Sequence, residues 1–114
     1  MHELGVVFSV IRQVEAVAAD NAVTRVNKVV LELGEVSTVI PAYLCDAWKW
    51  AIKRSQILRD AELEILRIDA VTFCEDCGRE YPTVQHGRTC PHCGSEKTYL
   101  LRGNEFIIKQ IEAE

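Results

Sequence analysis

The sequence predicts an α+β fold in which two helices pack on a three-stranded sheet and a small four-cysteine module is inserted before the last strand. Three observations support this prediction. Apolar residues recur at helical spacing, other segments alternate as half-buried strands do, and two Cys-x-x-Cys pairs interrupt the second half of the chain. With 114 residues, the chain has room for one compact core and one small module.

The N-terminal third of the chain predicts a helix followed by a strand. Apolar residues at helical spacing predict the helix from about Leu4 to Ala19. The segment Val26–Glu35 alternates in polarity and predicts a half-buried strand that ends at Gly34. One face of this strand carries Val29, Leu31 and Leu33, and the other face carries Lys28 and Glu32.

A second helix is predicted to begin near Pro41, whose fixed φ suits a first helical turn. Ser37 and Thr38 supply capping chemistry ahead of it. We expect both tryptophans of this segment to serve core and rim packing, and Cys45 to be a small buried apolar residue with no redox or metal role. The apolar face of the helix is formed by Leu44, Trp48 and Ile52.

The remaining segments predict strands around the cysteine module. Ala61–Phe73 predicts a second strand that leads straight into the module, and its alternation changes parity midway, which leaves a bulge open. Thr98–Leu101 is expected to close the module. Gly103 and Asn104 are expected to form a turn before a last strand over Glu105–Ile111.

Four of the five cysteines form two pairs, Cys74/Cys77 and Cys90/Cys93, with twelve residues between the pairs. Two such turns supply the four sulfur ligands of a tetrahedral zinc ion. The alternative is a pair of disulfides, which would leave Cys45 over, and nothing else in the chain indicates an oxidising compartment. Because a four-thiolate site has no open position for water, we predict structural Zn(II) and no catalysis there.

These elements define two expected domains. Residues 1–72 and 103–114 form an α/β domain, and residues 73–102 form a zinc-binding domain. The net charge is −4 and the charges within residues 74–102 balance, so we expect no nucleic-acid partner. No secretory signal and no membrane-length apolar run is present, so we expect a cytoplasmic protein without membrane insertion. No set of histidines and carboxylates is arranged as in a hydrolase, so we expect no enzyme.

The N-terminus is the second candidate metal site. Met1, His2 and Glu3 combine an amine, an imidazole and a carboxylate. The backbone amides of His2 and Glu3 can also bind metal once they lose their protons, which gives the nitrogen-rich set that Ni(II) or Cu(II) accepts. The alternative is an incidental N-terminus, because a histidine at the second position is usually unremarkable.

Several motifs together resemble the HypA/HybF family of nickel metallochaperones, which act in maturation of [NiFe]-hydrogenase. They are M-H-E-L, V-V-L-E-L-G-E-V-S, C-E-D-C-G, C-P-H-C-G and R-G-N-E-F, and the resemblance covers the whole chain. It implies that His2 is the essential nickel ligand, with the backbone of His2 and Glu3 nearby and the Met1 amine as a further candidate. It also implies that Cys74, Cys77, Cys90 and Cys93 hold structural zinc.

The resemblance further implies that nickel is delivered to the [NiFe]-hydrogenase large-subunit precursor in cooperation with the GTPase HypB; it leaves a homodimer open. Some relatives carry an acidic residue in the loop before the second helix. Here that loop reads S-T-V-I-P with Ile40 at that place, so we expect no carboxylate ligand from it.

Two questions stay open at this point. His86 and His92 lie beside the cysteines, and we hypothesise that they couple the zinc site to pH; the alternative is a pair of exposed loop histidines. The alternative function is a zinc-ribbon adaptor or nucleic-acid-associated module without a nickel role. The lack of a basic face counts against it.

Overall fold

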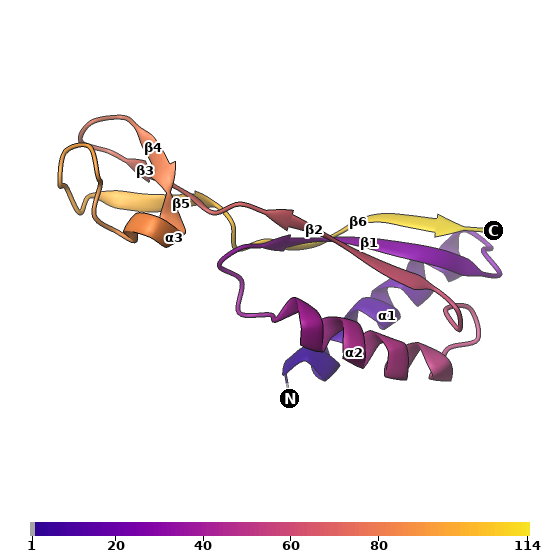
Figure 1. Ribbon diagram of the computed structural model, residues 1–114. Helices are drawn as coiled ribbons and strands as arrows, with labels where there is room; N and C mark the ends of the chain where they lie inside the picture. Colours follow the sequence, from indigo (N-terminus) through magenta and orange to yellow (C-terminus); the bar gives the residue numbers. More distant parts are fainter. Residues whose placement is uncertain (1) are drawn as a thin grey trace. The chain divides into compact units, whose positions relative to one another are not determined.

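The computed structural model describes the chain from His2 to Glu114, and its side chains from Glu3 onward. The chain divides into two compact units, one comprising residues up to 32, 39–66 and 107–114, the other 33–38 and 67–106. The helices and strands labelled in Figure 1 are α1 (His2–Asp20), β1 (Val26–Gly34), α2 (Pro41–Ala51), β2 (Glu62–Ile68), β3 (Val71–Cys74), β4 (Glu80–Pro82), α3 (Thr83–His86), β5 (Thr98–Arg102) and β6 (Phe106–Ala113). A short 3₁₀ turn, η1 (Ile52–Arg54), follows α2.

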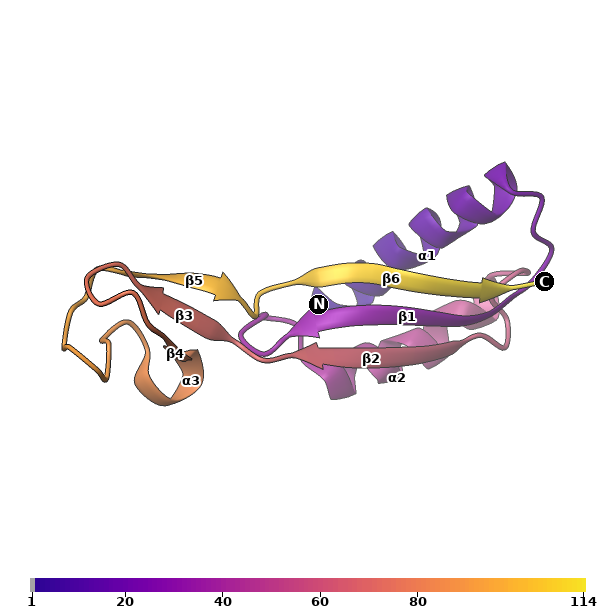
Figure 2. The same cartoon turned by 90° about the horizontal axis from the view of Figure 1, so that it is seen from above.

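Two helices and a three-stranded sheet build the first unit. The strand order is β2-β1-β6, and α1 and α2 both lie on the same face of this sheet (Figure 1). Seen from above, β1 and β2 point the same way and β6 points the opposite way (Figure 2). A parallel pair needs a long crossover, and α2 supplies it between β1 and β2. The predicted α+β fold is therefore confirmed, with the cysteine module inserted between β2 and β6.

The core of this unit lies between the sheet and the two helices, and the expected periodicities place residues there. Trp48 is 3% exposed, and its Nε1–H donates to the Ala61 carbonyl oxygen at 2.9 Å, so the one polar atom of a buried indole is paired. Side chains on the opposite face of β1 form ion pairs instead, Lys28 with Glu64 and Glu32 with Lys109. The fully buried side chains include Val7, Val10, Val14, Val29, Leu31 and Leu44.

Helix α1 confirms the predicted N-terminal helix and extends it at both ends, spanning His2–Asp20 rather than Leu4–Ala19. The predicted strands that correspond to β1 and β6 are confirmed to within two residues at each end, and the segment Thr98–Leu101, expected only to close the module, lies in strand β5. None of the helices in the described part of the chain is both long and apolar enough to cross a membrane.

The start of α2 differs from the expected capping pattern. Pro41 occupies the first turn as predicted, but the N-cap residue is Ile40 and no side chain caps the helix, so the prediction that Ser37 or Thr38 caps it was wrong. The Ile40 N–H instead donates to Glu3 Oε2 at 3.3 Å, a partner that only the packing of α1 against α2 supplies. Cys45 on the same helix is half-buried, less than expected.

The predicted single strand Ala61–Phe73 is two strands in two different sheets. Ala70 lies between β2 and β3; its N–H donates to Glu35 Oε1 at 2.8 Å and its carbonyl oxygen accepts the Thr83 N–H at 3.1 Å. The parity change itself lies between Ile65 and Leu66, inside β2, whereas the switch of sheet comes later, between β2 and β3. A register irregularity does occur, but it lies at the start of β3, where that strand pairs with β5.

Three chain segments meet closely at two glycines of the second unit. A Cβ on Gly34 would lie 2.0 Å from the Gly103 carbonyl oxygen, and a Cβ on Gly103 would lie 2.4 Å from Ala70 Cα. The Gly103 φ of +118° is also one that other residues rarely adopt. The contact is fixed by 2.8 Å hydrogen bonds from the Gly34 N–H to the Glu105 carbonyl and from the Val36 N–H to the Gly103 carbonyl.

We expect Gly34→Ala to destabilise the protein by about 1–3 kcal/mol or more, because the new methyl group would overlap backbone atoms that cannot rotate away. Urea unfolding followed by circular dichroism measures this. The matched control is Gly5→Ala in α1, where a Cβ meets no atom within 4 Å and helix propensity should stabilise by about 0.5–1 kcal/mol. Equal stability of Gly34→Ala and the wild type would contradict the close contact.

Candidate metal centre

Two equivalent turns hold the paired cysteines. The Gly78 N–H donates to the Cys74 carbonyl at 2.9 Å, and the Gly94 N–H donates to the Cys90 carbonyl at 2.8 Å. Both glycines have positive φ, +73° and +74°, which closes each turn without a Cβ clash. In each turn the N–H of the first cysteine also donates, at 2.9 Å, to the carbonyl of the residue five positions later. The first turn is anchored at the end of β3, which pairs antiparallel with β4 and β5.

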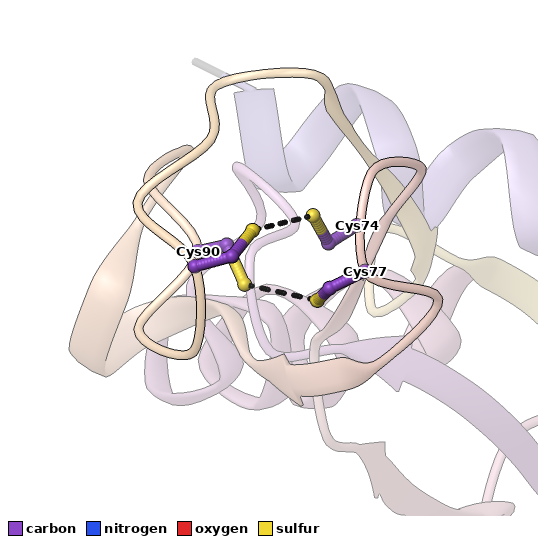
Figure 3. Close-up of side chains that lie close together, drawn as sticks. Cys74, Cys77 and Cys90 are labelled. Carbon is purple, nitrogen blue, oxygen red and sulfur yellow. Dashed lines mark hydrogen bonds between the residues drawn. The ribbon is translucent and has the colours of Figure 1, made fainter.

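These turns bring four sulfur atoms to one point. Figure 3 shows Cys74 and Cys77 facing Cys90, and the four cysteine sulfurs all lie within 4.8 Å of one another. The distance is 3.6 Å from Cys74 Sγ to Cys93 Sγ and 3.6 Å from Cys77 Sγ to Cys90 Sγ. Four sulfurs each about 2.3 Å from a tetrahedral zinc would lie roughly 3.8 Å apart. The donor set therefore fits one four-coordinate metal ion.

The same distances exclude the alternative of two disulfides in this structure. A disulfide bond holds its sulfurs about 2.05 Å apart, and all five cysteines are free thiols. The cluster is protected on one side only. Cys74 and Cys90 form a buried group with Tyr81, whereas Cys77 and Cys93 are exposed. Because this buried group is small, a bound metal would contribute much of the stability of the module.

The protonation of the thiols shows how strongly they influence one another. Burial raises the pKa of the Cys90 thiol. The backbone N–H groups of His92 and Cys93 and the neighbouring thiols lower this pKa by more than burial raises it, so that the net value is about 7. The Ser95 N–H lowers the pKa of Cys93, yet the Cys74 thiol, burial and the other thiols together raise it to about 12. One thiolate thus disfavours the next, and a cation would be needed to hold all four ionised.

The two histidines of this unit do not join the sulfur ligands. In the described part of the chain, the four cysteines form the one group of three or more potential ligand side chains that converge on a point. His86 packs edge-on against Tyr81, with ring centroids 5.9 Å apart. His92 contacts the cluster through its backbone, since its N–H donates to Cys90 Sγ at 3.4 Å.

The predicted N-terminal site is described only in part. Met1 and the imidazole of His2 lie outside the described residues, so their role as ligands stays a prediction. The backbone is helical from His2 onward. The carboxylate of Glu3 accepts the Ile40 N–H, which places position 40 beside the first turn of α1. Ile40 offers no oxygen ligand there, as the sequence indicated.

One feature beside this turn was not predicted. A groove of about 580 Å³ lies between α1 and α2, lined by Glu3, Leu4, Tyr43, Asp46, Ala47 and Trp50. Its sequence signal was the presence of two aromatic residues outside the core face of α2. That signal cannot be interpreted until the packing of the helices is known.

Comparisons with known proteins agree with the resemblance found in the motifs. The family model HypA, described as "Hydrogenase/urease nickel incorporation, metallochaperone, hypA", matches residues 1–113. The hydrogenase maturation factor HypA of Chlorobium phaeobacteroides (strain BS1) is 36% identical, and the hydrogenase maturation factor HybF of Klebsiella pneumoniae is 33% identical, each over 100% of both chains. The solution structure of the nickel metallochaperone HypA from Helicobacter pylori matches with a TM-score of 0.73 and 28% identity, covering 99% of this chain and 97% of that chain. With a cluster of four cysteines in the matching fold, this chain belongs to the HypA/HybF family of nickel metallochaperones and hydrogenase maturation factors.

Proposed function

We propose that this protein binds Ni(II) at its N-terminus and delivers it for assembly of the [NiFe]-hydrogenase active site, while the four cysteines hold a structural Zn(II). The observation that carries this proposal is the whole-chain match to a family of nickel metallochaperones. The protein then acts as a carrier and not as an enzyme. A cytoplasmic location stays an expectation from the sequence.

The nickel ligands proposed are the imidazole of His2 and the backbone nitrogens of His2 and Glu3, with the Met1 amine as a further candidate. Because α1 begins at His2, these amides lie in a first helical turn, where N–H groups have no partner within the helix. The positive end of the helix dipole also favours negative charge at this place, which helps an amide lose its proton to a metal. A set of a few terminal nitrogens suits an ion that must later be released.

The zinc proposed for Cys74, Cys77, Cys90 and Cys93 has a different role. Four thiolates fill the coordination of zinc, so the ion binds no water and supplies no chemistry beyond cross-linking two turns. Its binding energy becomes folding energy for the small module. We accordingly assign zinc to the domain of residues 73–102, and nickel to the domain of residues 1–72 and 103–114.

The partners proposed are the GTPase HypB and the [NiFe]-hydrogenase large-subunit precursor, with a homodimer as a further option. The family description also names urease, so a urease precursor is a second candidate recipient. None of these assignments requires binding to nucleic acid.

Nickel binding is tested by calorimetric titration of Ni(II) into the untagged, zinc-loaded protein. We expect about one nickel per chain for the wild type and loss of binding in His2→Ala, because an imidazole ligand is removed. A variant with one residue added before Met1 should also lose binding if the terminal amine contributes. His86→Ala is the matched histidine control and should bind as the wild type does. If His2→Ala binds like the wild type, the N-terminal site is wrong and an adaptor without a nickel role becomes the better proposal.

Zinc binding is tested by the metal content of purified variants, measured by mass spectrometry. Cys90→Ser should reduce zinc from about one ion per chain to near zero, because a serine hydroxyl does not replace a thiolate ligand. Cys45→Ser is the matched control and should retain the zinc, since Cys45 lies outside the sulfur cluster. Equal loss in both variants would show that the effect comes from general unfolding.

Zinc affinity should fall as the pH falls, because protons compete with the metal for the thiolates. The pKa of Cys77 is raised and that of Cys93 is raised to about 12, so both thiols are protonated at pH 7, and Cys90, with a pKa of about 7, is partly protonated. Zinc uptake should then release roughly two or more protons. The zinc affinity should accordingly fall at least about a hundredfold for each unit by which the pH is lowered near neutrality. Calorimetry in buffers of different ionisation enthalpy counts these protons. A release of fewer than two would contradict the expectation.

A further inference from the structure

The groove between α1 and α2 exposes the large aromatic side chains of the first unit. Tyr43 is 59% exposed and Trp50 is 47% exposed, and both line the groove together with Leu4 and Ala47. Exposed apolar side chains that share one groove with polar residues at its edge are a feature of interaction sites. Aromatic residues of this type also dominate the binding energy of protein interfaces.

The groove follows from a second apolar stripe on α2. Tyr43, Ala47 and Trp50 are spaced at i, i+4 and i+7, so they share one helix face. The core face of the same helix is formed by different residues, Leu44, Trp48 and Ala51, which are buried. The core face of α2 is buried within the first unit, whereas the second stripe is left exposed in the part of the chain that the structure describes.

The Trp50 side chain is held in place before any partner binds. The Trp50 ring packs edge-on against Phe8 of α1, with centroids 6.2 Å apart. The Arg54 guanidinium lies over the same ring, 4.3 Å from its centroid. A side chain fixed on two sides loses little further entropy when a ligand covers it. The small Ala47 leaves space beside the ring.

The charges of the lining determine which partner fits. The ionisable side chains of the lining are two carboxylates, Glu3 and Asp46, plus the phenol of Tyr43. Arg54 lies over the Trp50 ring and keeps its positive charge there. The Glu3 carboxylate already accepts the Ile40 N–H, so Asp46 is the carboxylate of the lining that a partner's cation would meet. An apolar surface with carboxylates complements a segment that presents apolar side chains flanked by lysine or arginine. A second copy of this chain, with a net charge of −4, and an anionic lipid surface are both less complementary.

We propose that this groove docks an amphipathic, cationic helix of a partner protein, with the apolar face of that helix against Tyr43 and Trp50 and a lysine or arginine at Asp46. This is the helix-in-groove mode of recognition. Glu3 belongs both to the groove and to the first turn of α1, so the docked helix would lie beside the N-terminal residues. The docking surface stands without nickel; its use in nickel transfer rests on the proposed function.

The test uses two synthetic peptides of about 18 residues patterned as amphipathic helices, one of leucine and lysine and the other of leucine and glutamate. Each is titrated into the zinc-loaded protein and followed by calorimetry and by tryptophan fluorescence. Both Trp48 and Trp50 contribute to this signal, and the exposed Trp50 is expected to respond to binding. We expect the lysine peptide to bind and the glutamate peptide not to bind. Tyr43→Ala and Asp46→Lys should each weaken the binding of the lysine peptide at least about tenfold, as central interface residues do.

The control for net charge is Asp20→Lys, which makes the same charge change as Asp46→Lys but at the last residue of α1. It should alter affinity less than about threefold, since an exposed charge away from the interface is screened. Equal weakening by both lysine variants would mean non-specific attraction and would overturn the proposal. So would unchanged affinity in Tyr43→Ala, or equal binding of both peptides.

Further measurements test whether the groove is occupied by a second copy of the chain or by lipid, and whether docking is independent of nickel binding. Sedimentation of the wild type and Tyr43→Ala, and binding to phosphatidylglycerol vesicles, would overturn the proposal if the groove drives self-association or lipid binding instead. Nickel titration of Tyr43→Ala and Asp46→Lys should match the wild type, because neither residue is a proposed ligand. If these variants lose binding of the lysine peptide but still bind nickel, the docking proposal is supported independently of the nickel site. If the wild type itself fails to bind nickel, the proposed function fails and the peptide-binding result still stands.

Discussion

The fold depends on one close backbone contact, the approach of Gly34 to Gly103 beside Ala70. A metal module inserted into a sheet requires the chain to leave after β2 and to return before β6 at nearly the same place. Side chains would hold the segments apart, and the two glycines allow them to touch. The hydrogen bonds from the Glu35 N–H to the Ile68 carbonyl and from the Val36 N–H to the Gly103 carbonyl then fix this contact. The motifs L-G-E-V-S and R-G-N-E-F are thus explained by backbone geometry before any functional role is considered.

The two metals proposed for this protein call for opposite chemistry. Four thiolates that converge from two turns would give a closed site suited to an ion that stays, because the binding energy of that ion would contribute to folding. Terminal nitrogens on the first helical turn give a small site suited to an ion that leaves. Intrinsic affinity would favour copper over nickel at such nitrogens, so selection must come from ligand geometry, metal supply and partner proteins.

The sequence predicted those features of the fold that depend on residues close together along the chain. The helical spacing of α1, the alternation of β1 and the cysteine spacing each depend on neighbours in sequence, and each prediction agrees with the structure. Periodicity does not say which sheet a strand joins, so the break at Ala70 between β2 and β3 was missed. The cap of α2 was missed because Glu3, which accepts the Ile40 N–H, comes from a different helix. The groove was missed because it exists only once α1 and α2 are packed.

Glu3 connects these features in one short stretch of chain. Its backbone is proposed to bind nickel, its carboxylate accepts the Ile40 N–H at the start of α2, and its side chain lines the groove. A partner whose cation drew that carboxylate away would leave the Ile40 N–H without its acceptor and would change the charge beside the nickel nitrogens. Any such coupling is reciprocal: a partner that changes nickel affinity by some factor has its own affinity changed by nickel by the same factor. A partner that binds the nickel-loaded form more tightly must therefore also strengthen nickel binding. Release of nickel then needs a further step. The partner can dissociate, a fall in local pH can protonate the nickel ligands, or a stronger nickel ligand on the recipient can take the ion.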